Sequence, residues 1–364
     1  MQYIYQNADW HKFTWCVEKV QNLLLEIKKS QGYLLGKMDA LGFEIKNNAT
    51  LQILTENIIK SSEIEGEILD KTSVRSSIAR RLGIDIGGEV YSSRNIDGIV
   101  EMMLDATQNF NEKISKDRLV GWHAALFPTG YSGIYKITVG NYRNDKFGPM
   151  RVVSGYEGKE KVHYEAPEAN VLDKEMNDLI EYINKANDID LLIKAGIAHL
   201  WFVILHPFDD GNGRIARALT DMLLARSDEN KFRFYSMSSQ IQKNRKSYYD
   251  VLEQTQKGSM DVTNWLVWFL ENLLSAIKSS DEILKDVLKR AEFWNKNSQV
   301  IFNERQKKVL NRFMDDFKGN LTTTKWAKMC NCSQDTATID IKDLISKKIL
   351  KKVGDGRNTH YVIK

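Results

Sequence analysis

The feature that most constrains the fold is an apolar run of fifteen residues, Leu191 to Leu205, interrupted by two polar side chains, Lys194 and His199. The run is shorter than the about 20 apolar residues that a bilayer span requires, so it predicts a buried helix of a globular core. Ile215 to Ala225 again places apolar residues at helical spacing. The polar loop between the two segments therefore joins two helices, and its glycines predict the break at Gly211 to Gly213.

That loop and the start of the second helix read His206-Pro207-Phe208-Asp209-Asp210-Gly211-Asn212-Gly213-Arg214-Ile215-Ala216-Arg217. A helix N-terminus presents unpaired N–H groups and a positive dipole end, and glycines let an anion approach the backbone. Arg214 and Arg217 lie three residues apart, so they share one face of the first turn and can bind neighbouring phosphates. Asp210 is a hard oxygen ligand that suits Mg²⁺, and the ordinary pKa of a histidine, about 6.5, suits His206 to take a proton near neutral pH.

Each of these residues has a simpler structural interpretation when taken alone. His206 can offset a helix dipole, Asp210 and Asn212-Gly213 can form ordinary turns, and Phe208 is expected to anchor the loop in the core in either case. Their combination within twelve residues favours a polyphosphate site. The chain contains no Ser-His-Asp signature, no H-E-x-x-H and no Walker loop, and phosphoryl-type transfer depends chiefly on positioning and charge neutralisation.

The same loop resembles the signature H-x-F-x-(D/E)-G-N-G-R-x-x-R of the Fic family at every specified position. The resemblance implies a mainly α fold with a small β-hairpin flap, and an adenylyltransferase that moves AMP from ATP to a protein hydroxyl with release of pyrophosphate. It implies that His206 is the base, Asp210 the Mg²⁺ ligand, Gly211, Asn212 and Gly213 the phosphate cradle, and Arg214 and Arg217 the partners of the β- and γ-phosphates. Related Fic folds transfer other phosphate-containing groups, but the intact arginines favour ATP.

A second segment, Asn48 to Ile68, also shows apolar residues at helical spacing, and Glu65 falls seven residues after Ile58. Seven residues are nearly two turns at about 3.6 residues per turn, so Glu65 is predicted on the buried stripe of this helix. A buried carboxylate needs a cationic partner or a raised pKa. The alternative is a boundary glutamate bonded to water or to a helix end.

Ser61-Ser62-Glu63-Ile64-Glu65-Gly66 resembles (S/T)-x-x-x-E-(G/N), the inhibitory helix motif of Fic proteins. The resemblance implies that Glu65 pairs with Arg217 and displaces the γ-phosphate, with Ser61 and Gly66 as the other motif positions. Because the motif precedes the Fic signature, the chain resembles the class with an N-terminal, intramolecular inhibitory helix. We hypothesise that Glu65 limits nucleotide binding in the resting enzyme.

Two further segments are expected near the nucleotide. The β-prone runs Arg151 to Ser154 and Lys161 to Glu165 flank Gly155-Tyr156-Glu157-Gly158 and predict a hairpin. The simplest interpretation is a surface hairpin. The family resemblance implies a flap that pairs with the target backbone, with Lys161, Val162 and His163 bordering the nucleotide. Tyr248-Tyr249, followed by Leu252 and Gln256, resembles the stretch that lines the adenine and ribose pocket, although such an aromatic pair more often belongs to a core.

Length and composition set the domain organisation. A chain of 364 residues with 42% hydrophobic residues and only four prolines indicates two or three helix-rich globular domains. The start of the chain has no secretory leader pattern, and three cysteines fit a reducing compartment, so we expect a cytoplasmic protein without membrane contact. Cys330 and Cys332 lack a second pair and form a poor zinc site.

The expected regions are an N-terminal helical region at 1–90 with the inhibitory helix at about 48–68, a Fic catalytic domain at 91–278, a helical connector at 279–300 and a winged helix-like domain at 301–364.

The last region differs in charge from the rest. Residues 301–364 hold 14 Lys or Arg and 7 Asp or Glu, a net charge of +7, so residues 1–300 carry −3. The pattern predicts three helices and two short strands, and it resembles a winged helix-turn-helix, a fold that often reads DNA through its third helix. The predicted elements are Glu304 to Phe317, Thr323 to Met329, Ser333 to Ser346, Ile349 to Val353 and Thr359 to Ile363.

The third helix of that region carries Asp335, Asp340 and Asp343, and it has Ile339 where DNA-binding relatives commonly place an arginine. Acidic groups repel phosphate, so target docking or self-association is favoured over DNA reading. Two hypotheses remain, an adenylyltransferase inhibited in cis and a DNA-binding transcriptional regulator whose Fic domain senses nucleotide. The resemblance also implies a target Ser, Thr or Tyr on another protein or on the chain itself, homodimerisation, and removal of AMP by the same site in some inhibited members.

Overall fold

The chain folds into two units, Met1–Ile283 and Leu284–Lys364, in a computed structural model that describes residues 2–86, 90–146, 148–155, 161–186, 189–314, 317 and 319–364. It is mainly helical, and its described strands form two-stranded antiparallel hairpins. Within these described ranges, no helix has the length and apolar character needed to cross a membrane.

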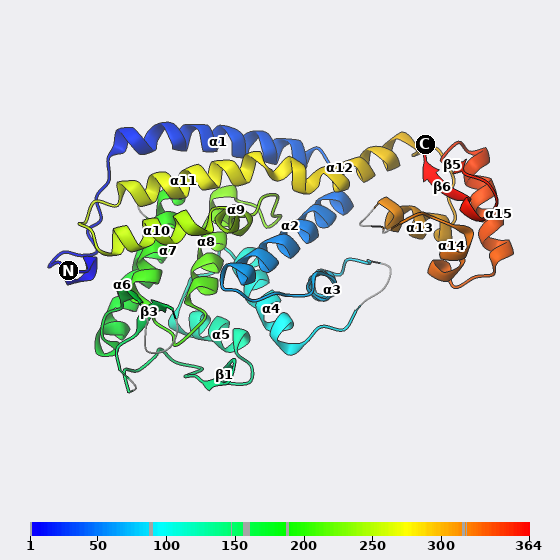
Figure 1. Cartoon of the computed structure of the whole chain (residues 1–364). Helices are drawn as coiled ribbons and strands as arrows, with labels where there is room; N and C mark the ends of the chain where they lie inside the picture. The colour runs from blue at the N-terminus through cyan, green and yellow to red at the C-terminus, as the bar shows by residue number, and fades with distance from the viewer. Residues whose placement is uncertain are drawn as a thin grey trace. The chain divides into compact units, whose positions relative to one another are not determined.

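The first unit contains a bundle of helices with two small hairpins on one side (Figure 1). Its elements are α1 (Val17–Asp39), α2 (Phe43–Ile64), α3 (Lys71–Leu82), α4 (Arg94–Gln108), α5 (Lys116–Leu126), β1 (Tyr131–Ser132), β2 (Tyr135–Lys136), β3 (Arg151–Ser154), β4 (Lys161–Glu165), α6 (Leu172–Asn184), α7 (Leu191–Leu205), α8 (Asn212–Asp228), α9 (Met237–Lys243), α10 (Arg245–Gln256) and α11 (Thr263–Lys278). The predicted N-terminal region and the predicted catalytic region both lie in this one unit.

Helices α7 and α8 form the centre of the first unit. Every residue of α7 from Leu192 to Leu205 is buried, which confirms the predicted buried helix. The side chain of Asp190 accepts a hydrogen bond from the Leu192 N–H and caps the start of α7. Helix α8 packs along α7 and is also covered by α4, while α1 lies along α11 and α2 packs against α9.

The break between α7 and α8 differs from the prediction. It runs from His206 to Gly211, because Asn212 and Gly213 already belong to the first turn of α8. Gly211 is the N-cap residue with φ +81°, a left-handed conformation that glycine adopts at little cost. The side chain of Asn212 closes the loop by bonding the backbone of Phe208, which allows the helix to begin early.

The segment expected as an inhibitory helix is shorter than predicted. Helix α2 ends at Ile64, so Glu65 lies just beyond the last turn and is exposed. The prediction that Glu65 sits on the buried stripe of a helix is therefore wrong. The physical reason is Gly66, whose φ of +84° turns the chain away from the helical path.

The predicted flap hairpin is present, and a second hairpin was not foreseen. Strands β3 and β4 pair antiparallel, with Arg151 opposite Glu165 and a register shift between Val152 and Val153. Of the predicted flap turn, residues 156–158 lie outside the described part of the chain. The additional hairpin of β1 and β2 is too short to show an alternating pattern in the sequence.

The second unit contains the elements expected of the tail, in the expected order. After α12 (Ser280–Lys296), which covers most of the predicted connector, come α13 (Glu304–Met314), α14 (Thr323–Cys330), α15 (Gln334–Ser346), β5 (Leu350–Val353) and β6 (His360–Ile363). Leu321 pairs with Tyr361 beside the antiparallel hairpin. Trp326 is fully buried in a core shared by the three helices and the hairpin.

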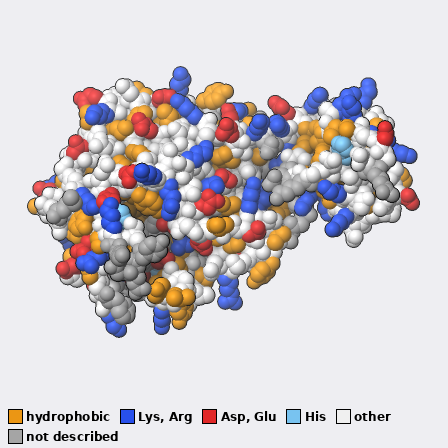
Figure 2. All heavy atoms as spheres, in the orientation of Figure 1, with side chains coloured by type: hydrophobic (Ala, Val, Ile, Leu, Met, Phe, Trp, Pro, Cys, Tyr) orange, Lys and Arg blue, Asp and Glu red, His pale blue; other side chains and the backbone are white. Residues whose placement is uncertain are grey.

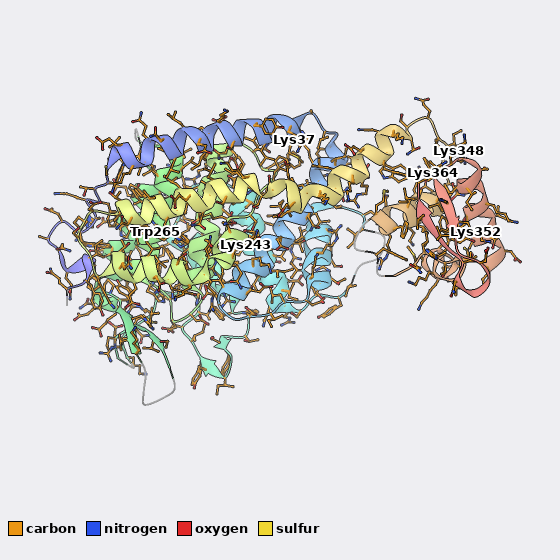
Figure 3. All side chains as sticks on the ribbon, turned by 45° about the horizontal axis from the view of Figure 1, so that its top comes forward. Lys37, Lys243, Trp265, Lys348, Lys352 and Lys364 are labelled. Carbon is orange, nitrogen blue, oxygen red and sulfur yellow. The ribbon has the colours of Figure 1, made fainter. Side chains whose placement is uncertain are left out.

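The charges of the second unit are arranged differently from the expectation. Asp340 is buried and its carboxylate bonds Arg305 at 2.7 and 2.9 Å, so it faces α13 and not solvent. Asp343 bonds Gln306 at 2.7 Å and Lys347 at 2.6 Å. The argument that acidic groups of the third helix would repel DNA therefore fails for Asp340. Figure 2 shows Lys and Arg side chains prominent on this unit, and Figure 3 places Lys348, Lys352 and Lys364 around its hairpin.

Candidate active site

His206 follows the last residue of α7 and has a strained backbone conformation, which determines the orientation of its imidazole ring. Its φ of +48° and ψ of +57° are left-handed, a region that non-glycine residues rarely occupy. The ring Nδ1 lies 3.3 Å from the carbonyl oxygen of Val203. Because a carbonyl only accepts, Nδ1 carries the hydrogen and Nε2 has the lone pair, which bonds no residue in the described part of the chain. Burial lowers the pKa of His206 to about 4, so the ring is neutral at physiological pH.

Arg143 fixes the backbone of the loop that begins at His206. Its side chain is buried, its Nε donates to the carbonyl oxygen of His206 at 2.8 Å, and its backbone N–H donates to Pro207 at 2.8 Å. The remaining guanidinium nitrogens bond Asp145 at 2.6 Å and the carbonyl of Pro167 at 2.5 Å. Arg143 was not predicted from the sequence, since no spacing rule relates it to the signature loop.

Phe208 and Asn212 close the loop. Phe208 is fully buried and its ring stacks on His123 with ring centres 4.2 Å apart. Asn212 Nδ2 donates to the Phe208 carbonyl at 2.7 Å, and the Phe208 N–H donates back to Asn212 Oδ1 at 3.0 Å. The side-chain amide of Asn212 is thus used within the loop. Because Asn212 is the first residue of α8, its backbone N–H belongs to the N–H groups at the helix N-terminus that have no partner within the helix.

Arg217 is buried and bonded to the end of α2. Its Nη2 donates to Glu65 Oε1 at 2.7 Å and to the Ser61 carbonyl at 2.9 Å, and its Nε donates to Ser61 Oγ at 2.8 Å. Burial opposes the charge, but the Glu65 carboxylate outweighs burial and raises the pKa of Arg217. The third nitrogen, Nη1, has no hydrogen-bond partner among the described residues. A buried guanidinium donor without a partner is suited to a further anion.

Arg214 is held by a different carboxylate. Its Nη1 donates to Glu67 Oε2 at 2.9 Å, and its guanidinium lies over the ring of Phe127 at 5.2 Å. The side chain is only 9% exposed, and its Nε has no partner within the described chain. Glu67 was not singled out from the sequence, although a second acid two residues after Glu65 was visible there.

The carboxylate of Glu65 lies close to Gly213 in the first turn of α8. A Cβ added at Gly213 would collide with Glu65 Oε1 and approach Arg217 Nη1. The N-terminus of a helix favours anions through its free N–H groups and its dipole. The arrangement therefore defines an anion position, filled here by a side chain of the same chain.

Asp210 is the candidate metal ligand. Its Oδ2 accepts from Ser132 Oγ at 2.5 Å and its Oδ1 from the Gly211 N–H at 2.6 Å. The carboxylate is 45% exposed beside Arg214. Mg²⁺ commonly binds through one or two carboxylates together with waters and phosphate oxygens, so a single half-exposed carboxylate next to a phosphate site fits this ion. Ser132, on β1, was not predicted.

The flap contacts α10 through a histidine. His163 Nδ1 lies 2.8 Å from Glu253 Oε2 and its Nε2 lies 2.6 Å from Ser154 Oγ, while Lys161 and Val162 on the same strand are exposed. The predicted adenine pocket residues separate into two groups. Tyr249 is partly exposed, whereas Tyr248 and Gln256 are buried. The Tyr248 hydroxyl bonds His199 Nε2 at 2.8 Å, which is a core contact.

Helix α10 also holds the end of α2. Arg245 Nε donates to the Ile64 carbonyl at 2.8 Å, and the Tyr249 hydroxyl donates to the same oxygen at 3.4 Å. This carbonyl lies at the last residue of α2, one position before Glu65. The turn that carries Glu65 is thus tied to the helix predicted to line the adenine pocket.

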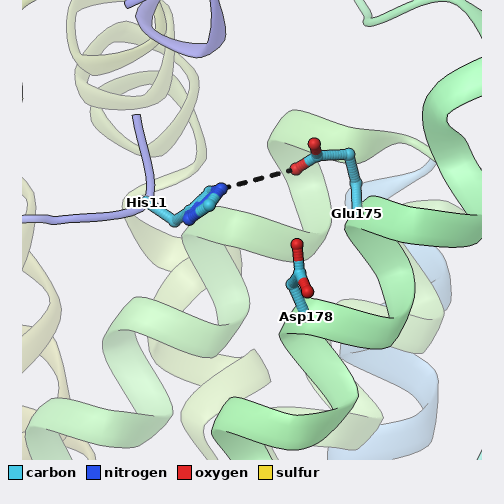
Figure 4. A group of neighbouring side chains, drawn as sticks. All are labelled: His11, Glu175 and Asp178. Carbon is cyan, nitrogen blue, oxygen red and sulfur yellow. Dashed lines mark ion pairs between the residues drawn. The ribbon is translucent and has the colours of Figure 1, made fainter. Parts of the chain in front are cut away.

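A separate group of potential ligands lies away from this site. His11 Nε2 is 3.9 Å from Glu175 Oε2, and Asp178 lies one turn further along α6 (Figure 4). Glu175 Oε1 is also 3.9 Å from Lys174 Nζ, and the His11 ring stacks on Trp201. These contacts are those of an ion pair that fastens the N-terminal segment to α6 and α7.

The helical core, the flap hairpin and the loop between α7 and α8 together define a domain of the Fic type. Residues 113–224 match the Fic/DOC family, and residues 3–84 match a domain of unknown function, DUF4172. The chain therefore carries a Fic domain preceded by a DUF4172 domain.

Relatives and solved structures agree with this assignment. The protein adenylyltransferase fic-1 of Caenorhabditis elegans is 29% identical over 96 residues, 26% of this chain and 18% of that protein. The protein adenylyltransferase Fic of Nematostella vectensis is 24% identical over 211 residues, 56% of this chain and 44% of that protein. The matched stretches thus span less than half of either relative. The fold is similar to that of a Fic family protein from Desulfovibrio desulfuricans G20, with a TM-score of 0.57 at 18% identity over 100% of this chain and 98% of that one.

Proposed function

We propose that the chain is a protein adenylyltransferase that transfers AMP from ATP to a hydroxyl group of a target protein or of itself, with release of pyrophosphate. One observation carries the proposal. An anion position at the N-terminus of α8, lined by Arg214 and Arg217, follows directly on the loop that begins with His206, whose Nδ1 bonds Val203 and whose Nε2 carries the lone pair. Relatives named protein adenylyltransferases support the same reaction class.

The residues have distinct tasks in this reaction. His206 Nε2 takes the proton of the incoming hydroxyl, whose oxygen then bonds the α-phosphorus of ATP. The bond from that phosphorus to the oxygen bridging to the β-phosphate breaks, and pyrophosphate leaves with the electron pair. Arg214, Arg217 and the N–H groups at the start of α8 neutralise the phosphate oxygens and fix the triphosphate.

Asp210 would hold Mg²⁺ in this site, and the bound ion would neutralise further phosphate charge. The Ser132 hydroxyl and the Gly211 N–H both donate to Asp210, so they orient its carboxylate. These two contacts leave the exposed side of the carboxylate available to a ligand.

We further propose that Glu65 inhibits the resting enzyme. Its carboxylate lies where the helix N-terminus and Arg217 would hold the γ-phosphate. Nucleotide binding in a productive orientation then requires this ion pair to open. Replacing Glu65 with Gly is expected to raise incorporation of labelled AMP well above that of the unmodified chain, and equal labelling would contradict the inhibition.

Isotope position tests the reaction itself. With Mg²⁺ and ATP labelled on the α-phosphate, the Glu65→Gly variant is expected to label itself or proteins of a lysate, whereas γ-labelled ATP transfers nothing. Adding His206→Ala to that variant is expected to abolish the label. Transfer of the γ-label would identify a kinase-type reaction instead, and label retained after His206→Ala would remove the base from the mechanism.

The second candidate function, a DNA-binding regulator, draws on one observation about the C-terminal unit. Asp340 is neutralised by Arg305 inside the unit, while Lys348 and Lys352 near the hairpin are exposed. A positive surface of this kind binds duplex DNA with a strong salt dependence. A mobility shift with duplex DNA at physiological salt would support this function, and absence of a shift would argue against it, with target docking and self-association as the remaining alternatives.

A further inference from the structure

The turn after α2 carries two carboxylates, and each contacts a different arginine of the Fic signature. Glu65 bonds Arg217 at 2.7 Å, and Glu67 bonds Arg214 at 2.9 Å across 147 positions of the chain. Both guanidinium groups are almost completely buried, and both retain one nitrogen without a partner among the described residues. The two arginines that would bind the phosphates are thus engaged at the same time.

We propose that Glu67 is a second inhibitory residue, which competes with the nucleotide for Arg214 as Glu65 competes for Arg217. The inference rests on the proposed function, because it assumes that Arg214 binds a phosphate of ATP. It differs from the inhibition expected from the sequence, which assigned a single glutamate to a single arginine.

The backbone explains how one turn supplies both carboxylates. The N–H groups of Glu65 and Glu67 both donate to the carbonyl of Ser62 at 3.0 Å, and the Gly66 N–H donates to Glu63 at 3.0 Å. Gly66, with φ +84°, reverses the chain between them. The two glutamates therefore project from one hydrogen-bonded turn toward Arg214 and Arg217. These arginines lie three residues apart near the start of α8 and share one face of the helix.

Competition follows from the chemistry of the guanidinium group. A carboxylate oxygen and a phosphate oxygen seek the same donors with the same geometry, so Arg214 Nη1 cannot serve both. Glu67 also adds a negative charge beside the triphosphate, an unfavourable interaction that solvent screens only in part. Because Glu65 and Glu67 belong to one turn, their contributions to the closed state are coupled, and comparing the double variant with the two single variants measures that coupling.

An opposite role for Glu67 gives an opposite prediction. If Glu67 oriented Arg214 for phosphate binding, removing its charge would weaken ATP binding. If Glu67 inhibits, removing its charge strengthens ATP binding. The sign of the change in affinity therefore separates the two roles.

The test measures ATP affinity by calorimetry in the presence of Mg²⁺, with all variants built on His206→Ala so that no turnover occurs. Glu65→Gln, Glu67→Gln and the double variant are compared with Glu63→Gln as matched control. Glu63 lies on the same segment but pairs with Lys60 at 2.7 Å. We expect Glu67→Gln to tighten ATP binding on the order of tenfold in the Glu65→Gln background, a modest value for a charge-assisted hydrogen bond. Glu63→Gln is expected to leave it unchanged.

Unchanged or weaker ATP binding after Glu67→Gln would overturn the inference. Thermal unfolding of each variant shows whether the fold persists, as expected for the partly exposed Glu67. The double variant with His206 intact separates this inference from the proposed function. Tighter ATP binding without label transfer would refute the transfer reaction but support Glu67 as an inhibitory residue. Label transfer without any effect of Glu67→Gln on ATP binding would support the transfer reaction and refute the inhibitory role of Glu67.

Discussion

Arg143 Nε donates a hydrogen bond of 2.8 Å to the backbone carbonyl of His206, the residue that the structure places at the end of α7 in a left-handed conformation. A left-handed conformation of a non-glycine residue is unfavourable by about 1 kcal/mol or more and persists only where its surroundings enforce it. The Arg143 side chain supplies that enforcement, because it bonds the loop, Asp145 and the carbonyl of Pro167 together.

Replacing Arg143 with Met is therefore expected to misplace the His206 ring. The rate of AMP transfer should fall on the order of 100-fold, the cost of an error of about 1 Å at a reacting group. The KM for ATP should change little, since Arg143 does not contact the anion position. Steady-state kinetics at a temperature below unfolding checks this. Arg151→Met, which removes a surface pair with Glu165, is the control, and equal losses in both variants would contradict the positioning role.

The pH dependence of transfer follows from the same histidine. Burial lowers the pKa of His206 to about 4, so the neutral, proton-accepting form predominates at all pH values well above 4. The rate of label transfer is expected to stay level between pH 8 and about pH 5.5 and to fall only as the pH approaches 4. An acid limb centred near 6.5, the ordinary value for histidine, would show that the ring is more exposed to water in the working enzyme.

Acid should also unfold the protein through buried histidines that are not part of the reaction. Burial lowers the pKa of His123 to about 4 and that of His199 to about 3, and neither ring nitrogen of His123 has a partner among the described residues. Between an unfolded-state pKa of about 6.5 and a folded-state pKa of about 4, such a histidine is protonated in the unfolded chain but not in the folded protein. The stability that it contributes is therefore fully present above about pH 6.5 and is lost as the pH falls through about 4.

His123→Phe keeps the stacking on Phe208 and removes one of these protons. It is expected to reduce the slope of unfolding free energy against pH between 4.5 and 6 by up to about 1.4 kcal/mol per pH unit. Urea unfolding at several pH values measures the slope, and a comparison at pH 8 isolates any packing effect. An unaltered slope would show that His123 is not protonated on unfolding.

Gly213→Ala gives a different result from Glu65→Gly. A methyl group at Gly213 would displace the Glu65 carboxylate, but it would also stand where a phosphate must approach the N-terminus of α8. Gly213 lies in the helix and is not among the glycines with positive φ, so alanine fits its backbone. We expect no activation of labelling in Gly213→Ala. Activation equal to that of Glu65→Gly would mean that the phosphate binds elsewhere.

Much of the fold and of the signature loop was predictable because it rests on local patterns. The apolar run of α7 and the helical spacing of α8 predicted both helices, and the β-prone runs predicted the β3 and β4 pair. The ends of the elements were less predictable. Periodicity extended the inhibitory helix to Ile68, whereas the positive φ of Gly66 ends it at Ile64.

The contacts that complete the site are long-range, and local patterns carry no information on them. Arg143 lies 63 positions from His206, and Glu67 lies 147 positions from Arg214. Asp340 looked like a surface acid of the third helix of the tail, yet it faces Arg305 because residue 340 falls on the same side of α15 as the buried Ala337, Ile341 and Leu344. Each of these assignments depends on how elements pack, which spacing along the chain does not determine.

The carbonyl of Ile64 accepts hydrogen bonds from Arg245 and Tyr249 of α10. Both hydrogen bonds come from α10, so the position of the Glu65 turn depends on a helix that lies outside the phosphate-binding loop. A substitution at either donor would loosen the restraint while leaving base, metal ligand and phosphate partners untouched. The strength of the proposed inhibition is in this way adjustable at Arg245, a position that takes no part in the proposed transfer.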